Sequence, residues 1–208
     1  MTRFAAERRA FTRLQKHCPP ESRREYERAL RTLLERYNTT IHENRFVVGG
    51  AVEVFTCALL RSVGLDCSLY SAQEQAGDIL LPKGKKLSVK GSFKGGAQDI
   101  KLINQMGGGR RDWNTATLFV LSGEGIVYGA PDMVAAEHIK QVGDGVVLKR
   151  AGLQMLMSQP KNLFAMDIAL KPPTETTAFS EKASVAVAKQ ILLEAEEQLL
   201  WKAFSAEG

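Results

Sequence analysis

Three charged side chains in the middle of the chain could do chemistry together, and two of them lie in neighbouring predicted strands. Asp78 follows Gly77 and opens an apolar segment, and Lys90 comes twelve residues later in a segment of alternating polarity. A turn at about 82–85 would make the two segments a hairpin, with Asp78 opposite Lys90 or one step away. Ser88 shares the strand face of Lys90, because side chains two residues apart point the same way. An ordinary cross-strand ion pair, worth about 0.2–1 kcal/mol, would have the same spacing.

Glu53 is the third candidate, because it lies in the most apolar predicted helix, which we place at about 50–63. An isolated buried carboxylate is costly, so it must be paired or bind a cation. A structural salt bridge, for instance to Arg45 or Arg61, is one explanation. We favour a metal or active site, since an aspartate and a lysine follow so closely along the chain.

The elements that must position these residues follow from periodicity and from turn residues. Their order predicts an α/β fold with a mixed central β-sheet flanked by helices. Helices are expected at 3–16, 21–37, 50–63, 97–106, 131–140 and 180–204, and strands at 65–71, 78–81, 86–93, 116–121, 125–128, 146–148 and 163–170.

The length of 208 residues suits one domain with additions. We expect a helical N-terminal region at 1–44, packed on a core at 45–171. The chain would end in a C-terminal helix at 172–208, a candidate dimer contact.

Residues 50–93 resemble the core of the PD-(D/E)XK nucleases, a superfamily that includes many restriction endonucleases. That family places a glutamate on a first helix, an aspartate at the start of a hairpin strand, and an acid-x-lysine on the next strand. Glu53, Asp78 and Lys90 match these positions, whereas Ser88 stands where the second acid is expected. The resemblance implies a restriction endonuclease-like core with helical N- and C-terminal additions. It also implies that the missing acid is supplied by Glu53 or by Asp99, on the following predicted helix.

The same resemblance implies the cofactor and the catalytic roles. Mg²⁺ prefers oxygen ligands, and Asp78 and Glu53 would hold it with the backbone carbonyl of Val89. Lys90 would orient the attacking water or offset charge on the phosphate. Ser88 would hydrogen-bond that water. Phosphodiester hydrolysis is the chemistry that such a set performs.

The charge distribution fits a nucleic-acid partner. The net charge is +5, a modest bias towards polyanions. The arginines of the first 36 residues are expected to be solvated helix faces rather than DNA contacts. Basic and amide side chains after the predicted hairpin could read bases or contact phosphates, although an ordinary exposed loop is an equal alternative. These predicted DNA-binding residues are Lys94, Lys101, Asn104, Gln105, Arg110, Arg111 and Asn114.

We therefore expect a Mg²⁺-dependent endonuclease of the type II restriction kind, acting on double-stranded DNA as a homodimer. The alternatives are another nuclease with this core, such as a junction resolvase or a repair or nicking enzyme, and a basic DNA-binding module without catalysis. No segment is apolar for long enough to span a bilayer, and we expect a cytoplasmic protein. The three cysteines lack the spacing of a disulfide framework or a zinc site.

Overall fold

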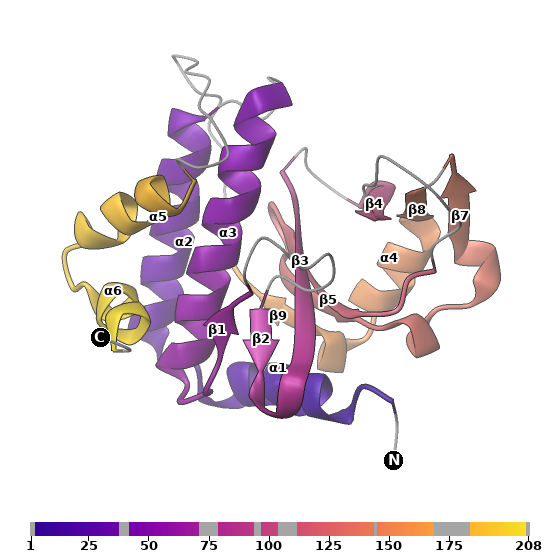
Figure 1. The fold of residues 1–208 in the computed structure, drawn as a ribbon, viewed down its shortest axis with the longest axis horizontal. Coiled ribbons are helices and arrows are strands. Elements are labelled where there is room, and N and C mark those ends of the chain that lie inside the picture. Colours follow the sequence, from indigo (N-terminus) through magenta and orange to yellow (C-terminus); the bar gives the residue numbers. More distant parts are fainter. Residues whose placement is uncertain are drawn as a thin grey trace.

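The computed structural model describes residues 3–37, 42–70, 79–93, 97–103, 112–143, 145–168 and 184–206. Helices in these ranges flank a mixed β-sheet, which confirms the predicted α/β class (Figure 1). The helices are α1 (Ala5–His17), α2 (Pro20–Arg36), α3 (His42–Ser62), α4 (Arg150–Met157), α5 (Ser184–Leu193) and α6 (Leu199–Ser205).

The large sheet has the strand order β1-β2-β3-β5-β6-β9. Strands β3 and β5 run parallel, and the other neighbours in this sheet are antiparallel. A smaller antiparallel sheet has the order β4-β8-β7. The strands are β1 (Ser68–Leu69), β2 (Ile79–Leu81), β3 (Lys85–Ser92), β4 (Ile100–Ile103), β5 (Ala116–Leu121), β6 (Gly125–Gly129), β7 (Ile139–Val142), β8 (Gly145–Leu148) and β9 (Leu163–Ala165).

Helix α3 is central because it is apolar on nearly every side. In the view of Figure 1 it stands between helices α2, α5 and α6 on one side and the large sheet on the other. A buried hydrogen bond of 3.0 Å between the hydroxyls of Tyr26 and Thr56 joins it to α2. A helix with no polar stripe has to be enclosed by other elements. Residues 51–60 are buried except for Glu53, which is of intermediate exposure rather than buried as the sequence predicted.

Strand β5 separates two hydrophobic cores, because all its residues are buried and successive side chains point to opposite faces. Leu118 and Val120 belong to the core that contains α1, α2 and α3. Phe119 and Leu121 belong to a second core beneath α4 and the small sheet. A strand buried on both faces reads as a continuous apolar run, as this one does.

Four predicted helices differ from the structure, and the one expected at 50–63 is α3 (His42–Ser62), which begins earlier in the chain. The expected helix at 97–106 contains β4 instead, where Ile100 and Leu102 are buried and Lys101 is exposed. The expected helix at 131–140 is replaced by two short 3₁₀ turns followed by β7. Both β4 and β7 pair with β8. Strand β4 pairs with a strand far along the chain and β7 with its neighbour in a hairpin, and in both cases strand pairing overrides the local helical pattern.

The expected C-terminal helix at 180–204 is two helices, α5 and α6. Gln198 has a left-handed backbone conformation (φ +52°), which breaks the helix. The carboxylate of Glu25 on α2 then accepts a 3.1 Å hydrogen bond from the backbone N–H of Leu200. The break lets α6 fold back across α2 and α3, so both C-terminal helices are part of the main core.

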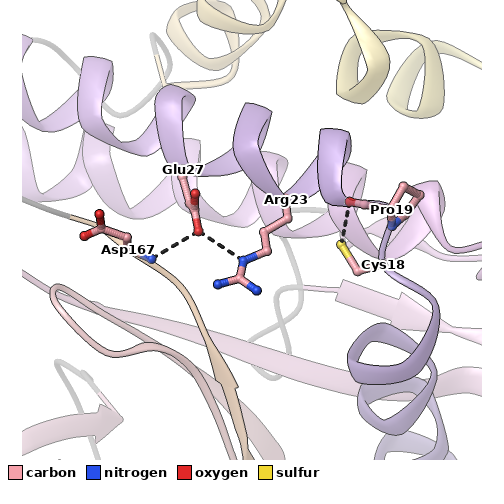
Figure 2. A network of polar contacts seen from close by, with 5 residues as sticks. All are labelled: Cys18, Pro19, Arg23, Glu27 and Asp167. Carbon is pink, nitrogen blue, oxygen red and sulfur yellow. Dashed lines mark hydrogen bonds and ion pairs between the residues drawn. The ribbon is translucent and has the colours of Figure 1, made fainter.

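Glu27 on α2 also holds the chain beyond β9, as Figure 2 shows. Its Oε1 accepts hydrogen bonds from Arg23 Nε at 3.2 Å and from the backbone N–H of Asp167 at 3.1 Å. Arg23 in turn lies over the ring of Phe164, 5.6 Å from its centroid. One carboxylate therefore both neutralises an arginine and ties a distant strand end to α2.

Cys57 and Cys67 are buried side by side as thiols, with the two Sγ atoms 3.9 Å apart. Neither belongs to a group of metal-binding side chains within the ranges that the structure describes. Among the described helices, none is both long and apolar enough to cross a membrane.

Candidate active site on the β2–β3 hairpin

The predicted hairpin exists, and its turn lies where the sequence indicates. Strands β2 and β3 pair antiparallel, with Ile79 opposite Leu87. The turn at Pro82–Gly84 contains two positive φ angles, at Lys83 and Gly84. Asp78 is the residue immediately before β2 in the sequence, and it lies outside the described residues.

One face of β3 is polar along its whole length, and we call it the polar face of β3. It carries Lys86, Ser88, Lys90 and Ser92, all of intermediate exposure. The alternating residues Leu87 and Val89 are buried in the core with α3. The structure therefore brings Ser88 and Lys90 to the same side, about 6.6 Å apart along the strand at 3.3 Å per residue.

Strand β5 shows which side of the sheet this is. In the parallel register Ser88 lies beside Thr117, and Lys90 lies beside Phe119. Phe119 packs in the second core, with its ring 6.3 Å from that of Trp113. The polar face of β3 is thus on the side of the second core, opposite to the side that α3 covers.

Contacts with neighbouring helices show the direction of Glu53 on α3. A side chain at Gly50 would meet Ser184 of α5, and Thr56 is bonded to Tyr26 of α2. At about 100° per residue around the helix axis, Glu53 is turned roughly 300° from Gly50. Thr56 is turned roughly 240° from Gly50 on the same count. Glu53 therefore falls in the sector between α5 and α2.

The opposite side of α3 is left for the sheet. Ala51 and Phe55 lie on that side, turned roughly 100° and 140° from Gly50, and both are fully buried. Helix geometry thus turns Glu53 towards the sector between α5 and α2. Its role as a metal ligand stays a prediction.

Asp99, the alternative acid, has a structural task in the described part of the chain. Its Oδ1 accepts a 2.8 Å hydrogen bond from the backbone N–H of Arg150, the first residue of α4. Such a bond satisfies one of the amide groups that a helix N-terminus leaves without an internal partner. Asp99 precedes β4 rather than lying on a helix.

Lys86 on the polar face of β3 contacts Tyr70, which directly follows β1, and the sequence reasoning missed both residues. The Lys86 ammonium donates a 2.7 Å hydrogen bond to the Tyr70 hydroxyl and lies 3.9 Å from the ring centroid. The signal was present, because Lys86 keeps the same two-residue alternation as Ser88 and Lys90. The side of the hairpin that would face a substrate therefore carries two lysines.

The predicted DNA-binding residues are described only in part. Lys101 is exposed on β4, opposite Val147 of β8. Asn114 is exposed and accepts a 2.9 Å hydrogen bond from the Thr115 hydroxyl. Trp113 beside it is buried and donates to Thr117 Oγ1, so it is a core residue. The other five, Lys94, Asn104, Gln105, Arg110 and Arg111, lie outside the described residues.

A magnesium site can be tested against the oxygen donors at the hairpin. The described residues contain no group of three or more histidine, cysteine, aspartate or glutamate side chains able to hold a metal ion. At the hairpin itself, the predicted metal ligand among them is the Val89 carbonyl. A cation there would depend on Asp78 for its carboxylate.

Comparison with known proteins adds no relative: no family model matches the chain, and no curated protein matches it significantly.

Proposed function

We propose that the protein is a Mg²⁺-dependent endodeoxyribonuclease whose active site lies on the β2–β3 hairpin. One observation carries this proposal: Ser88 and Lys90 share a face of β3, and the strand paired with β3 begins directly after Asp78. The order of a helix, a hairpin strand and a lysine-bearing strand also agrees with the resemblance to the PD-(D/E)XK core.

The residues of the hairpin would divide the work. Asp78 would hold the magnesium ion together with the Val89 carbonyl, and Glu53 is the further acid that the sequence suggests. A bound Mg²⁺ would polarise the scissile phosphate and lower the pKa of a coordinated water. The Lys90 ammonium would offset negative charge that develops on the phosphate. The Ser88 hydroxyl would accept a hydrogen bond from the attacking water or donate one to it.

This function makes a geometric demand on Asp78. Ile79 pairs with Leu87, so a pairing extended by one residue would set Asp78 beside Ser88. A carboxylate there would lie on the same face as Lys90, two residues away along the strand. We take the enzyme to be of the type II restriction kind, with double-stranded DNA as its substrate. Cleavage of both strands calls for two active sites and hence a homodimer.

Incubation of the full chain with phage DNA and Mg²⁺, with and without EDTA, tests the activity. We expect Lys90→Ala to slow cleavage by roughly 10²–10⁴-fold, the range for loss of a positioned catalytic group, and Asp78→Asn to abolish metal-dependent cleavage. Lys85→Ala is the matched control, because it removes one exposed lysine from the same strand. Cleavage by Lys90→Ala at the rate of the Lys85→Ala control would refute the site.

The form of the products separates the nuclease classes. A restriction endonuclease gives a fixed set of fragments from phage DNA, whereas a junction resolvase cuts branched substrates. Wild-type protein that binds DNA but cleaves neither substrate with Mg²⁺ would favour a non-catalytic binding module. Glu53→Gln adds a further readout: unchanged cleavage with altered unfolding would assign this residue to the helix packing.

A further inference from the structure

Helix α1 presents an outer face on which the charged side chains are all cationic. Its residues line a hollow of about 560 Å³, and no carboxylate contributes to that lining. We call this surface the α1 basic face. It consists of Arg8, Arg9, Thr12, Arg13, Lys16 and His17.

The amphipathic pattern of α1 produces this separation of charge. Phe11 and Leu14 are fully buried in the main core. Glu7, the acid of this helix, is buried with them at 4% exposure. Its burial keeps this carboxylate out of the solvent-facing surface, where Arg9, Arg13 and Lys16 are exposed.

Two arginines of the α1 basic face are held by neutral groups. Arg8 donates a 2.7 Å hydrogen bond to Asn162 Oδ1, and its guanidinium lies 4.9 Å from the centroid of the Tyr128 ring. Arg13 Nε donates a 2.6 Å hydrogen bond to the backbone carbonyl of Val63. These contacts fix the side chains without cancelling their charge.

No ion pair between described residues includes a member of the α1 basic face. The four ion pairs there are all made by arginines of α2. A cationic surface whose side chains form no ion pair favours a polyanion.

We infer that the α1 basic face binds the phosphate backbone of duplex DNA, as a contact additional to the β2–β3 hairpin. This inference rests on the proposed function for the choice of DNA among polyanions. Arg9 and Lys16 are about 10 Å apart along the helix axis at 1.5 Å per residue. That span covers roughly three phosphates of one strand at 3.4 Å each. Arginine and lysine contacts of this kind position a protein on DNA and do not read its sequence.

The salt dependence of DNA binding tests the inference without any cleavage. Binding of a 25-base-pair duplex is measured by fluorescence anisotropy in EDTA across a series of NaCl concentrations. The slope of log K against log[salt] is negative, and each lost phosphate contact reduces its magnitude by about 0.9. For the double variant Arg9→Ala/Lys16→Ala we therefore expect a slope whose magnitude is about 1.8 smaller than that of wild type. This change should not depend on the sequence of the duplex.

A matched control is the double variant Arg24→Ala/Arg28→Ala. It removes the same formal charge from α2, where both arginines are paired with glutamates. Equal effects of the two double variants would show a mere net-charge effect and overturn the inference. Two results would do the same: a slope unchanged in the α1 variant, or loss of binding to anionic phospholipid vesicles with DNA binding intact.

The outcomes distinguish this inference from the proposed function. A smaller slope in the α1 variant, in a protein that never cleaves DNA with Mg²⁺, would leave the inference standing and refute the nuclease. Cleavage by wild type, with the same DNA affinity and slope in the α1 variant, would support the nuclease and refute the inference. Wild type that binds no DNA at any salt concentration would refute the inference.

Discussion

Helices α1 and α2 are both rich in arginine, yet they use it in opposite ways. On α2, Arg23 and Arg24 pair with glutamates of the same helix, and Arg28 and Arg36 pair with glutamates near the C-terminus. On α1, Arg8 meets an amide oxygen and an aromatic ring, and Arg13 meets a backbone carbonyl. Four of the five arginines of α2 are therefore compensated within the molecule, whereas no ion pair between described residues includes an arginine of α1.

The difference shows that a count of arginines does not measure surface charge. The sequence predicts a solvated face for both helices. What separates them is where the acids lie: beside the arginines on α2, and buried beneath them on α1 in the case of Glu7. Exposed pairs of this kind add little stability, so their main effect on α2 is to neutralise its surface.

Replacing Phe11 of α1 by alanine is expected to have the largest effect on this comparison. Phe11 is fully buried, and its ring stacks on Tyr128 with a centroid distance of 5.5 Å. Its truncation should lower the free energy of unfolding by about 3–5 kcal/mol, measured by urea denaturation. Thr12→Ala, on the outer face, should change it by less than about 0.5 kcal/mol. A loss below about 1 kcal/mol for Phe11→Ala would mean that α1 is loosely attached and that its arginines are not fixed.

Replacing Gly64 by alanine tests the link between α1 and the end of α3, with an intermediate effect. Gly64 has φ +71°, and a Cβ there would lie 2.9 Å from a guanidinium nitrogen of Arg13. The left-handed conformation costs a residue with a side chain about 1–2 kcal/mol, and we expect that loss in the free energy of unfolding. Gly49→Ala is the control, because a Cβ there meets nothing within 4 Å and helical alanine is favourable. Equal stabilities of the two variants would contradict the strain.

Replacing Glu194 by glutamine should have the smallest effect, and it acts on the compensated helix. Arg36 donates a 2.6 Å hydrogen bond to Glu194 and holds the pKa of that carboxyl below its usual value of 4.5. A lowered pKa in the folded state means that the pair stabilises the protein above about pH 4.5. This contribution is lost as the pH falls through the folded-state pKa. For this exposed pair we expect a loss of about 0.2–1 kcal/mol at pH 7.

The same variant should match wild type in stability once the carboxyl is protonated, because glutamine then replaces a neutral acid. Urea unfolding at pH 7 and at about pH 2 measures the difference. A constant difference at both pH values would exclude the ion pair as its cause. Removing Glu194 should also leave Arg36 uncompensated and raise the salt slope of DNA binding slightly, which would make α2 more like α1.

Sequence periodicity was sufficient wherever a segment is stabilised by its own pattern. Helices α1 and α2, the β2–β3 hairpin and strands β5 and β6 lie close to the predicted ranges. The alternation along β3 also placed Ser88 and Lys90 on one face. Periods of 3.6 and 2 residues, together with turn residues, encode such features locally. The assignment of Asp78, Glu53 and Lys90 to one metal centre needs more than local pattern, and it remains a prediction.

The sequence by itself determined the fold class, the hairpin and the face of β3 that carries Lys90. Only the tertiary structure decided that 97–106 contributes a strand and that Glu53 lies in the sector between α2 and α5. It also decided which arginines meet a carboxylate. The physical reason is that these outcomes depend on partners far along the chain, such as Arg150, 51 residues from Asp99, and Glu194, 158 residues from Arg36. A local window cannot contain those partners, and packing around a shared core selects them.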